Sequence, residues 1–366
     1  MKKGKHMPNK VTIKDIAKNT GVSVASVHRA LHGMSGVGEE LRRQILEEAR
    51  RCHYQMDESA ALLRRNSTNI TVLLPKATGN ERFYYRGLWQ GINHGAEKLR
   101  KMRVTVSMIE TEYGIDEMGE ALEKLYDATG FGEQRMDGLV TICDDERTKN
   151  WITRFIRRGT KVALIDRGLP IKGLVCSAEV SVENMGNLAV ELADLYHKDQ
   201  EKGSLLLVNG SFGRSSYRTY SQAVYKRMTE KWKDRKMTVS EISGESEHEF
   251  RKKLRKMFED DSPDIILAAS ARITYWVCDE VEQFFAEEKT YPVVIGTDVF
   301  PEQAYFFEKG ILKATVYQSH LISGEHCLEY LFNSLIGLDN ELEKKIIEPL
   351  CIVMKDNYRY FLSTEI

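Results

Sequence analysis

The sequence predicts an α/β protein in two parts: an all-helical N-terminal head, and a two-lobed body of doubly wound parallel sheets with helices on both faces. Its length of 366 residues suggests two or three domains. From residue 69 onward, short apolar runs alternate with amphipathic helical segments, which is the βα pattern of parallel sheets. Residues 1–70 hold 13 Lys and Arg but only 7 Asp and Glu, whereas the rest of the chain carries a net charge of −7. A basic head on an acidic body is typical of a nucleic-acid-binding module joined to a second domain.

The composition argues against several classes of protein. Hydrophobic residues make up 42 % of the chain and charged residues 29 %, which favours a packed core over disorder. No apolar run reaches the ~18 residues that a membrane span needs, and the basic N-terminus lacks the apolar stretch of a secretory signal. The six cysteines are scattered without a C-x-x-C pair, so we expect a reduced cytoplasmic protein with no disulfide framework, metal site or cofactor.

The head has the pattern of three helices. Thr12 can begin the first helix, with Asp15 placed to bond back to it, and Gly21 ends it. Ser23 can begin the second helix, and a third follows at about 39–51. Two helices joined by a tight turn and supported by a third make a helix-turn-helix unit. The outward face of the second helix is made of Val24, Ala25, His28, Arg29 and His32.

The run VTIKDIAKNTGVSVASVHRALHG, residues 11–33, resembles the head signature of the LacI–GalR family of bacterial regulators. The alternative is an unrelated small helical bundle. The resemblance implies that the helix at 23–31 enters the major groove of operator DNA, with Val24, Ala25 and Arg29 at the specificity positions. Arg29 can make bidentate hydrogen bonds to guanine, whereas the other two offer only apolar contact. Five further residues complete the set of predicted DNA contacts. Three carry hydroxyl groups suited to phosphate contacts, and two are histidines where the family has Ser and Asn: Thr12, Ser23, Ser26, His28 and His32.

The segment 57–68 matches the family's hinge. Residues 59–65 could form two helical turns, which are marginal in water on their own. The resemblance implies a hinge that folds on operator DNA in a dimer and presses a Leu into the minor groove, and Leu63 matches that Leu. An ordinary linker is the alternative, but the neighbouring Arg64 and Arg65 favour contact with DNA.

The body, residues 69–366, is predicted to bind an effector and to dimerise, after a DNA-binding domain at 1–56. Its strand-end residues resemble those of the type I periplasmic sugar-binding fold of LacI–GalR effector domains, particularly the ribose-binding branch. The lobes are expected at about 69–165 with 318–346, and at 166–317 with 347–366. Strands are expected at 70–74, 104–108, 138–142, 162–165, 205–208, 265–268 and 293–295.

Polar and aromatic residues at strand ends form the predicted ligand set, because ligands of such sheets bind at the carboxyl ends of the strands. By the resemblance, aromatic faces stack on a sugar ring while charged groups bond to its hydroxyls. Ser270 stands where the family has Asn, which leaves open a ligand other than the usual monosaccharide. Each member has a structural alternative, such as helix capping by Asp298 or core packing by Tyr84 and Tyr85. The set is Tyr84, Tyr85, Asp166, Arg167, Arg218, Ser270, Trp276, Asp298 and Gln318.

These features predict a sequence-specific DNA-binding regulator, a repressor, controlled by a sugar or sugar derivative held in a cleft between two lobes. We expect a homodimer on near-palindromic double-stranded operator DNA, associated with the nucleoid and with no membrane partner. One alternative is a cleft that binds a non-sugar ligand or a partner protein. A transport-type sugar-binding protein is disfavoured by the head, and an enzyme by the lack of a G-x-G-x-x-G, P-loop or G-x-S-x-G motif. The basic run 251–256 is interpreted as a solvated helix face, and His320 and His326 as structural.

Overall fold

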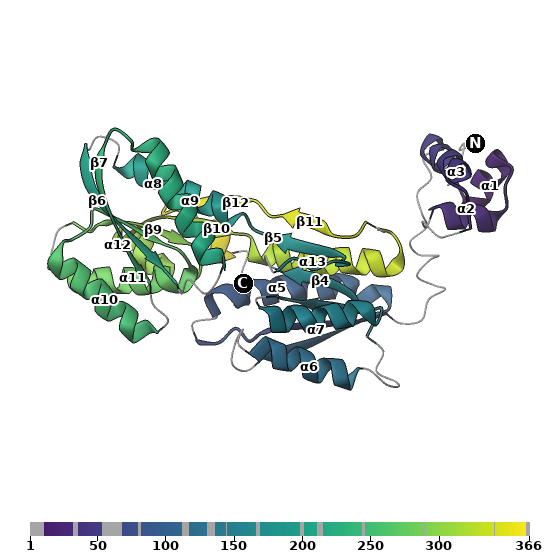
Figure 1. The fold of residues 1–366 in the computed structure, drawn as a ribbon, viewed down its shortest axis with the longest axis horizontal. Coiled ribbons are helices and arrows are strands. Elements are labelled where there is room, and N and C mark those ends of the chain that lie inside the picture. Colours follow the sequence, from purple (N-terminus) through teal and green to yellow (C-terminus); the bar gives the residue numbers. More distant parts are fainter. Residues whose placement is uncertain are drawn as a thin grey trace, which may run out of the picture.

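A computed structural model gives the fold of the chain (Figure 1). It describes residues 11–31, 36–52, 68–79, 82–111, 117–129, 136–143, 145–165, 169–197, 201–210, 215–243, 246–287, 290–339 and 341–363. The predicted hinge therefore lies outside the described residues, except for Thr68 at its end.

The head consists of three helices at the predicted places: α1 (Ile13–Thr20), α2 (Val24–Leu31) and α3 (Glu39–Arg51). Ile16, Val27 and Ile45, one from each helix, are fully buried against one another in a small apolar cluster. Gly21 ends α1 with a φ of 68°, a left-handed conformation that glycine adopts without steric cost. The buried cluster holds α2 against α1 and α3, which leaves its other face to the surface.

The first half of the body, which we name the N-lobe, is built on a six-stranded parallel sheet. Its strand order is β11-β5-β4-β3-β1-β2. The helices α5 and α13 pack together on one face of this sheet, and α6 packs beside α7 on the other (Figure 1). The strands are β1 (Thr68–Pro75), β2 (Val104–Thr111), β3 (Gly138–Thr141), β4 (Lys161–Ile165), β5 (Cys176–Glu179) and β11 (Lys344–Ile347). The helices are α5 (Arg82–Leu99), the short 3-10 helix η2 (Arg100–Met102), α6 (Met118–Ala128), α7 (Glu146–Arg157) and α13 (His320–Ile336).

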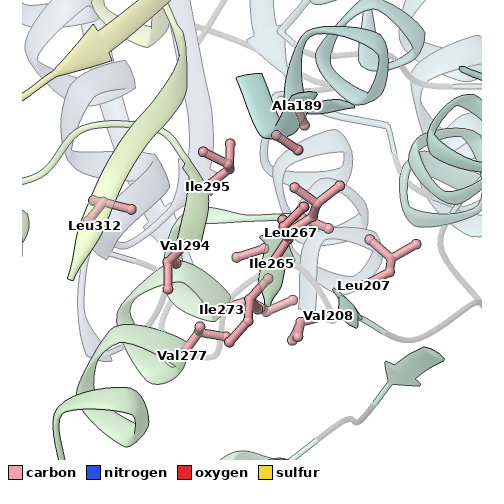
Figure 2. Close-up of a cluster of buried hydrophobic side chains, with 14 of the residues drawn as sticks. Ala189, Leu207, Val208, Ile265, Leu267, Ile273, Val277, Val294, Ile295 and Leu312 are labelled. Carbon is pink, nitrogen blue, oxygen red and sulfur yellow. The ribbon is translucent and has the colours of Figure 1, made fainter. Parts of the chain in front are cut away.

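The second half, the C-lobe, repeats this architecture with the order β12-β10-β9-β8-β6-β7, in which only β12 runs antiparallel to its neighbour. Aliphatic side chains of its central strands and of α8 and α11 form the buried core that Figure 2 shows. The strands are β6 (Lys202–Asn209), β7 (Lys236–Ser243), β8 (Ile265–Ala268), β9 (Val293–Thr297), β10 (Leu312–Gln318) and β12 (Leu350–Met354). The helices are α8 (Val182–Tyr196), α9 (Ser215–Lys231), α10 (Glu247–Asp260), α11 (Ala271–Phe284), α12 (Gln303–Lys309) and α14 (Tyr358–Ser363).

The chain crosses between the lobes three times: after β5, after β10 and after β11. This corrects one predicted boundary. The first lobe was expected to end at residue 165, but β5 pairs with β4 in the N-lobe sheet, so the first crossing lies near residue 180. Residues 169–179 therefore belong to the N-lobe. Within the described ranges, every helix is too short or too polar to cross a membrane.

Candidate DNA-binding surface and effector site

The start of α1 is fixed by Thr12 and Asp15, as predicted. The backbone N–H and the hydroxyl of Thr12 both donate to one carboxylate oxygen of Asp15, at 2.8 and 2.7 Å. These bonds, above all the one from the hydroxyl, lower the pKa of Asp15. The Thr12 hydroxyl is thus the donor in its hydrogen bond with Asp15, and its oxygen can still accept a hydrogen bond.

The start of α2 is fixed by Ser23, whose hydroxyl accepts a hydrogen bond from the backbone N–H of Ser26 at 3.1 Å. Beyond this cap, Val24, Ala25 and Arg29 are exposed, while Val27 faces the head's core. His28 is exposed on the same surface. The predicted outward face of α2 is confirmed as an exposed surface, and His32 and Leu63 lie outside the described residues.

A polar cluster that sequence reasoning missed ties α1 to the end of α3. The Asn19 amide donates to Glu48 at 2.7 Å, and Arg51 donates to both oxygens of the same carboxylate, each at 2.7 Å. The Cys52 thiol also donates to it at 3.0 Å. These hydrogen bonds, led by those from Arg51, lower the pKa of Glu48 to about 2. The cluster holds α1 against the end of α3.

The two lobes meet where their strands end, and Asp298 lies at this lobe junction. It follows β9 in a left-handed conformation with a φ of 65°, which is uncommon for a residue other than glycine. Its side chain is 2 % exposed and accepts hydrogen bonds from the Gln318 amide and from His320, both at 3.0 Å. A strained, buried carboxylate with two side-chain donors is typical of a functional position rather than of a surface helix cap.

His320 brings the N-lobe to this carboxylate. It is the first residue of α13, is buried, and lies with its ring centroid 4.4 Å from that of Tyr84 on α5. Asp298, His320 and Tyr84 therefore link both lobes through one chain of contacts. The sequence interpretation of His320 as structural did not connect it with Asp298, because the two residues lie 22 positions apart in the chain.

An aromatic cluster also joins the lobes. Phe83 of α5 lies 4.4 Å from Phe300 and 5.4 Å from Tyr275 of the C-lobe, measured between ring centroids. Beside it, the Arg82 guanidinium lies 3.9 Å from the centre of the Phe83 ring and forms an ion pair with Glu302 of the C-lobe at 3.0 Å. The predicted set did not include Phe83, which is the aromatic residue that reaches across.

Two predicted ligand residues lie elsewhere than expected. Trp276 is buried in the C-lobe core, 5.3 Å from the ring of Phe250, because it shares the inward face of α11 with Ile273 and Val277. Tyr85 is buried in the N-lobe core, although its ring contacts Tyr84. Both side chains pack in the lobe cores, and their contact with a ligand stays a prediction.

Tyr217 of α9, which sequence reasoning did not select, is buried in the C-lobe core at the end of β6. Its ring lies against Gly210, where a Cβ would come within 2.1 Å of it, so only glycine fits at the end of β6. Its hydroxyl is 3.5 Å from that of the predicted Ser270 at the start of α11. The predicted Arg218 is exposed on α9, and Asp166 and Arg167 lie outside the described residues. The part of the chain that the structure describes contains no cluster of His, Cys, Asp and Glu that could hold a metal ion.

Comparison with known proteins matches both parts of the chain. Residues 71–339 match the model of the periplasmic binding protein domain, and residues 12–57 match that of bacterial regulatory proteins of the lacI family. The chain is 33 % identical over 101 residues to the HTH-type transcriptional regulator pepR1 of Lactobacillus delbrueckii subsp. lactis, which covers 27 % of this chain and 29 % of that protein. The matches span only 24 % to 41 % of the length of the curated relatives.

Two solved structures share the fold. The glucose-galactose binding protein GanP of Geobacillus stearothermophilus has a TM-score of 0.66 at 19 % identity, over 80 % of this chain and 99 % of its own. The transcriptional regulator CelR in complex with cellobiose has a TM-score of 0.59 at 14 % identity, over 94 % of this chain and 98 % of its own. The first is similar to the body, and the second to nearly the whole chain.

Proposed function

Because this chain belongs to the family of the periplasmic binding protein domain and carries a lacI-type head, we propose that it is a sequence-specific DNA-binding repressor controlled by a small ligand. The observation that carries the proposal is the exposed face of α2 behind its Ser23 cap, with Arg29 and Val24 open to a partner. A helix of this size fits the major groove, where a guanidinium and an apolar side chain can distinguish base pairs.

We propose that the effector binds at the lobe junction, around Asp298 and Gln318, and that it is a carbohydrate. A buried carboxylate that already accepts from a side-chain amide and an imidazole is suited to hydroxyl donors, and the aromatic side chains beside it offer apolar faces to a sugar ring. Two proteins of the same fold are named for sugars, one as a glucose-galactose binding protein and one as a cellobiose complex.

The proposed mechanism couples this junction to DNA through the spacing of two heads in a homodimer. A ligand that bonds to groups from both lobes favours one lobe arrangement by its differential affinity, typically ~1–3 kcal/mol. A changed lobe arrangement moves the points at which the two heads are attached and so changes the distance between the heads. Two half-sites about 34–36 Å apart fit only one distance between the heads. Ligand binding therefore changes operator affinity without touching the DNA.

A thermal-shift screen tests the effector proposal. The probes are D-glucose, D-galactose, D-ribose, cellobiose, glucose 6-phosphate and, as a non-sugar, adenine. We expect at least one carbohydrate to raise the melting temperature of the wild-type chain and to leave an Asp298→Ala variant unchanged. Asp260→Ala, an exposed carboxylate at the end of α10, is the matched control and should respond like the wild type. A shift with adenine alone, or with no probe, would contradict the carbohydrate assignment.

A further inference from the structure

The edge of the N-lobe at which its strands begin carries four exposed basic residues, which we name the basic rim: Arg100, Lys101, Arg103 and Arg157. The first two lie in η2, Arg103 joins η2 to β2, and Arg157 ends α7, four residues before β4 begins. β1 pairs with β2 and β3, and β3 pairs with β4, so these strand starts lie side by side.

The rim surrounds the point where the chain enters the body from the head. Thr68 is the first residue of β1, and its backbone N–H donates to the carbonyl of Arg103 at 3.2 Å. In Figure 1 the C-terminal end of α7 reaches the same end of the N-lobe, away from the C-lobe. The chain therefore joins this edge of the body to the head through the segment that ends at Thr68.

Three of the four rim charges have no ion-pair partner among the described residues, whereas Arg100 pairs with Glu97. Within the described ranges, Lys101, Arg103 and Arg157 form no ion pair, and the side chain of Arg100 is 77 % exposed with Glu97 at 3.4 Å. Acids also lie at this edge: Asp137 accepts the backbone N–H of Asn69 at 3.0 Å, Asp127 is exposed near the end of α6, and Glu329 and Asp339 line a pocket together with Met102 of η2. The rim thus presents three exposed cations that are unpaired among the described residues, although the chain after residue 70 carries a net charge of −7.

We propose that the basic rim binds the phosphate backbone of the operator DNA, so that the N-lobe adds a second contact surface to that of the heads. This inference rests on the proposed DNA-binding function. If Leu63 enters the minor groove as proposed, Thr68 is five residues away and lies within ~18 Å of the DNA, since an extended chain spans at most ~3.6 Å per residue. Arginine and lysine side chains reach across part of that distance, and the attraction acts over a Debye length of about 10 Å at 0.1 M salt.

Phosphate contacts add affinity without sequence information. The rim should therefore strengthen binding to every duplex and steepen its dependence on salt. Each phosphate that a protein neutralises contributes about 0.9 to the slope of log K against log salt concentration.

The experiment replaces three rim residues in the full chain by Lys101→Gln, Arg103→Gln and Arg157→Gln. The control carries the same loss of charge on exposed C-lobe lysines that form no ion pair within the described residues: Lys233→Gln, Lys252→Gln and Lys256→Gln. Binding to a duplex selected from a random pool, and to a scrambled duplex, is measured by fluorescence anisotropy at KCl concentrations between 50 and 200 mM. The melting temperature of each variant is measured alongside.

We expect the rim variant to bind both duplexes more weakly by the same factor. Its salt slope should become less steep by about 0.9 for each phosphate that the variant no longer neutralises, while its melting temperature and its preference for the selected duplex stay those of the wild type. The C-lobe control should bind like the wild type. A rim variant with wild-type affinity and slope overturns the inference and leaves the proposed function intact. A wild-type chain that binds neither duplex overturns both.

Discussion

Replacing Asp298 by Ala removes the acceptor on which both lobes converge. This carboxylate is buried and accepts hydrogen bonds from the Gln318 amide and from His320, each at 3.0 Å. Because the surroundings are closed to water, the two donors left behind by the substitution cannot be solvated easily. The variant should therefore lose stability as well as ligand affinity.

The decrease in stability can be worked from these two hydrogen bonds. Each hydrogen bond to a charged group contributes ~1.5–3 kcal/mol, so two of them suggest a decrease of about 3–6 kcal/mol in the free energy of unfolding. The substitution relieves little backbone strain at position 298, because alanine at a positive φ is strained as well. For a lobe of 150–250 residues, each kcal/mol lowers the melting temperature by ~2–4 °C, so we expect a fall of roughly 6–24 °C.

The assay is differential scanning calorimetry of the wild type, Asp298→Ala and the exposed control Asp260→Ala. The control should melt within a degree or two of the wild type, since surface substitutions usually change stability by less than 0.5 kcal/mol. His320→Ala should reproduce part of the decrease, because it removes one of the two side-chain donors. If Asp298→Ala melts like the wild type and keeps a wild-type ligand response on DNA, our assignment of the effector site is wrong.

Arg29→Ala should cost ~1–3 kcal/mol of operator affinity and relax the preference at one base pair per half-site, whereas equal decreases on operator and scrambled duplexes would make Arg29 a phosphate contact. Leu63→Ala should reduce both DNA bending and operator affinity while ligand-induced thermal shifts stay normal, and unchanged bending in a circular-permutation gel shift would rule out the wedge. Glu48→Gln should speed hydrogen exchange of the α1 amides at pH 7. Because the pKa of Glu48 falls from 4.5 to about 2 in the folded head, its stabilisation is complete above pH 4.5 and is lost as the pH falls towards 2. The wild type should therefore lose protection of α1 over that interval, and a Glu48→Gln variant with the same pH profile would show that the carboxylate does not hold α1.

The head could be predicted well because its signals are local. Thr12 and Asp15, Gly21 and Ser23 each act within three or four residues, and the structure places all of them at the helix ends where their chemistry is needed. The strands with continuous apolar runs could be predicted equally well from the sequence. β5 was missed because Cys176–Glu179 is short and polar in part, and its place is decided by pairing with β4 rather than by its own pattern.

The lobe junction could be predicted only in part, because it is assembled from residues far apart in the sequence. Asp298 and Gln318 were found from their places at strand ends, and they do meet. His320 and Phe83 were not, since nothing local distinguishes a histidine that faces Asp298 from one that faces solvent. Trp276, which was predicted to contact the ligand, packs in the C-lobe core beside Ile273 at helical spacing, and its contact with a ligand stays a prediction.

Selection of binding sites from a pool of random duplexes, with and without the carbohydrate found by thermal shift, tests the proposed function most directly. We expect enrichment of one near-palindromic sequence, bound at least ~10³-fold more tightly than scrambled DNA, and an affinity that the carbohydrate changes by about 5–150-fold. No enriched sequence, or an enriched sequence whose affinity no carbohydrate alters, would contradict a ligand-controlled repressor.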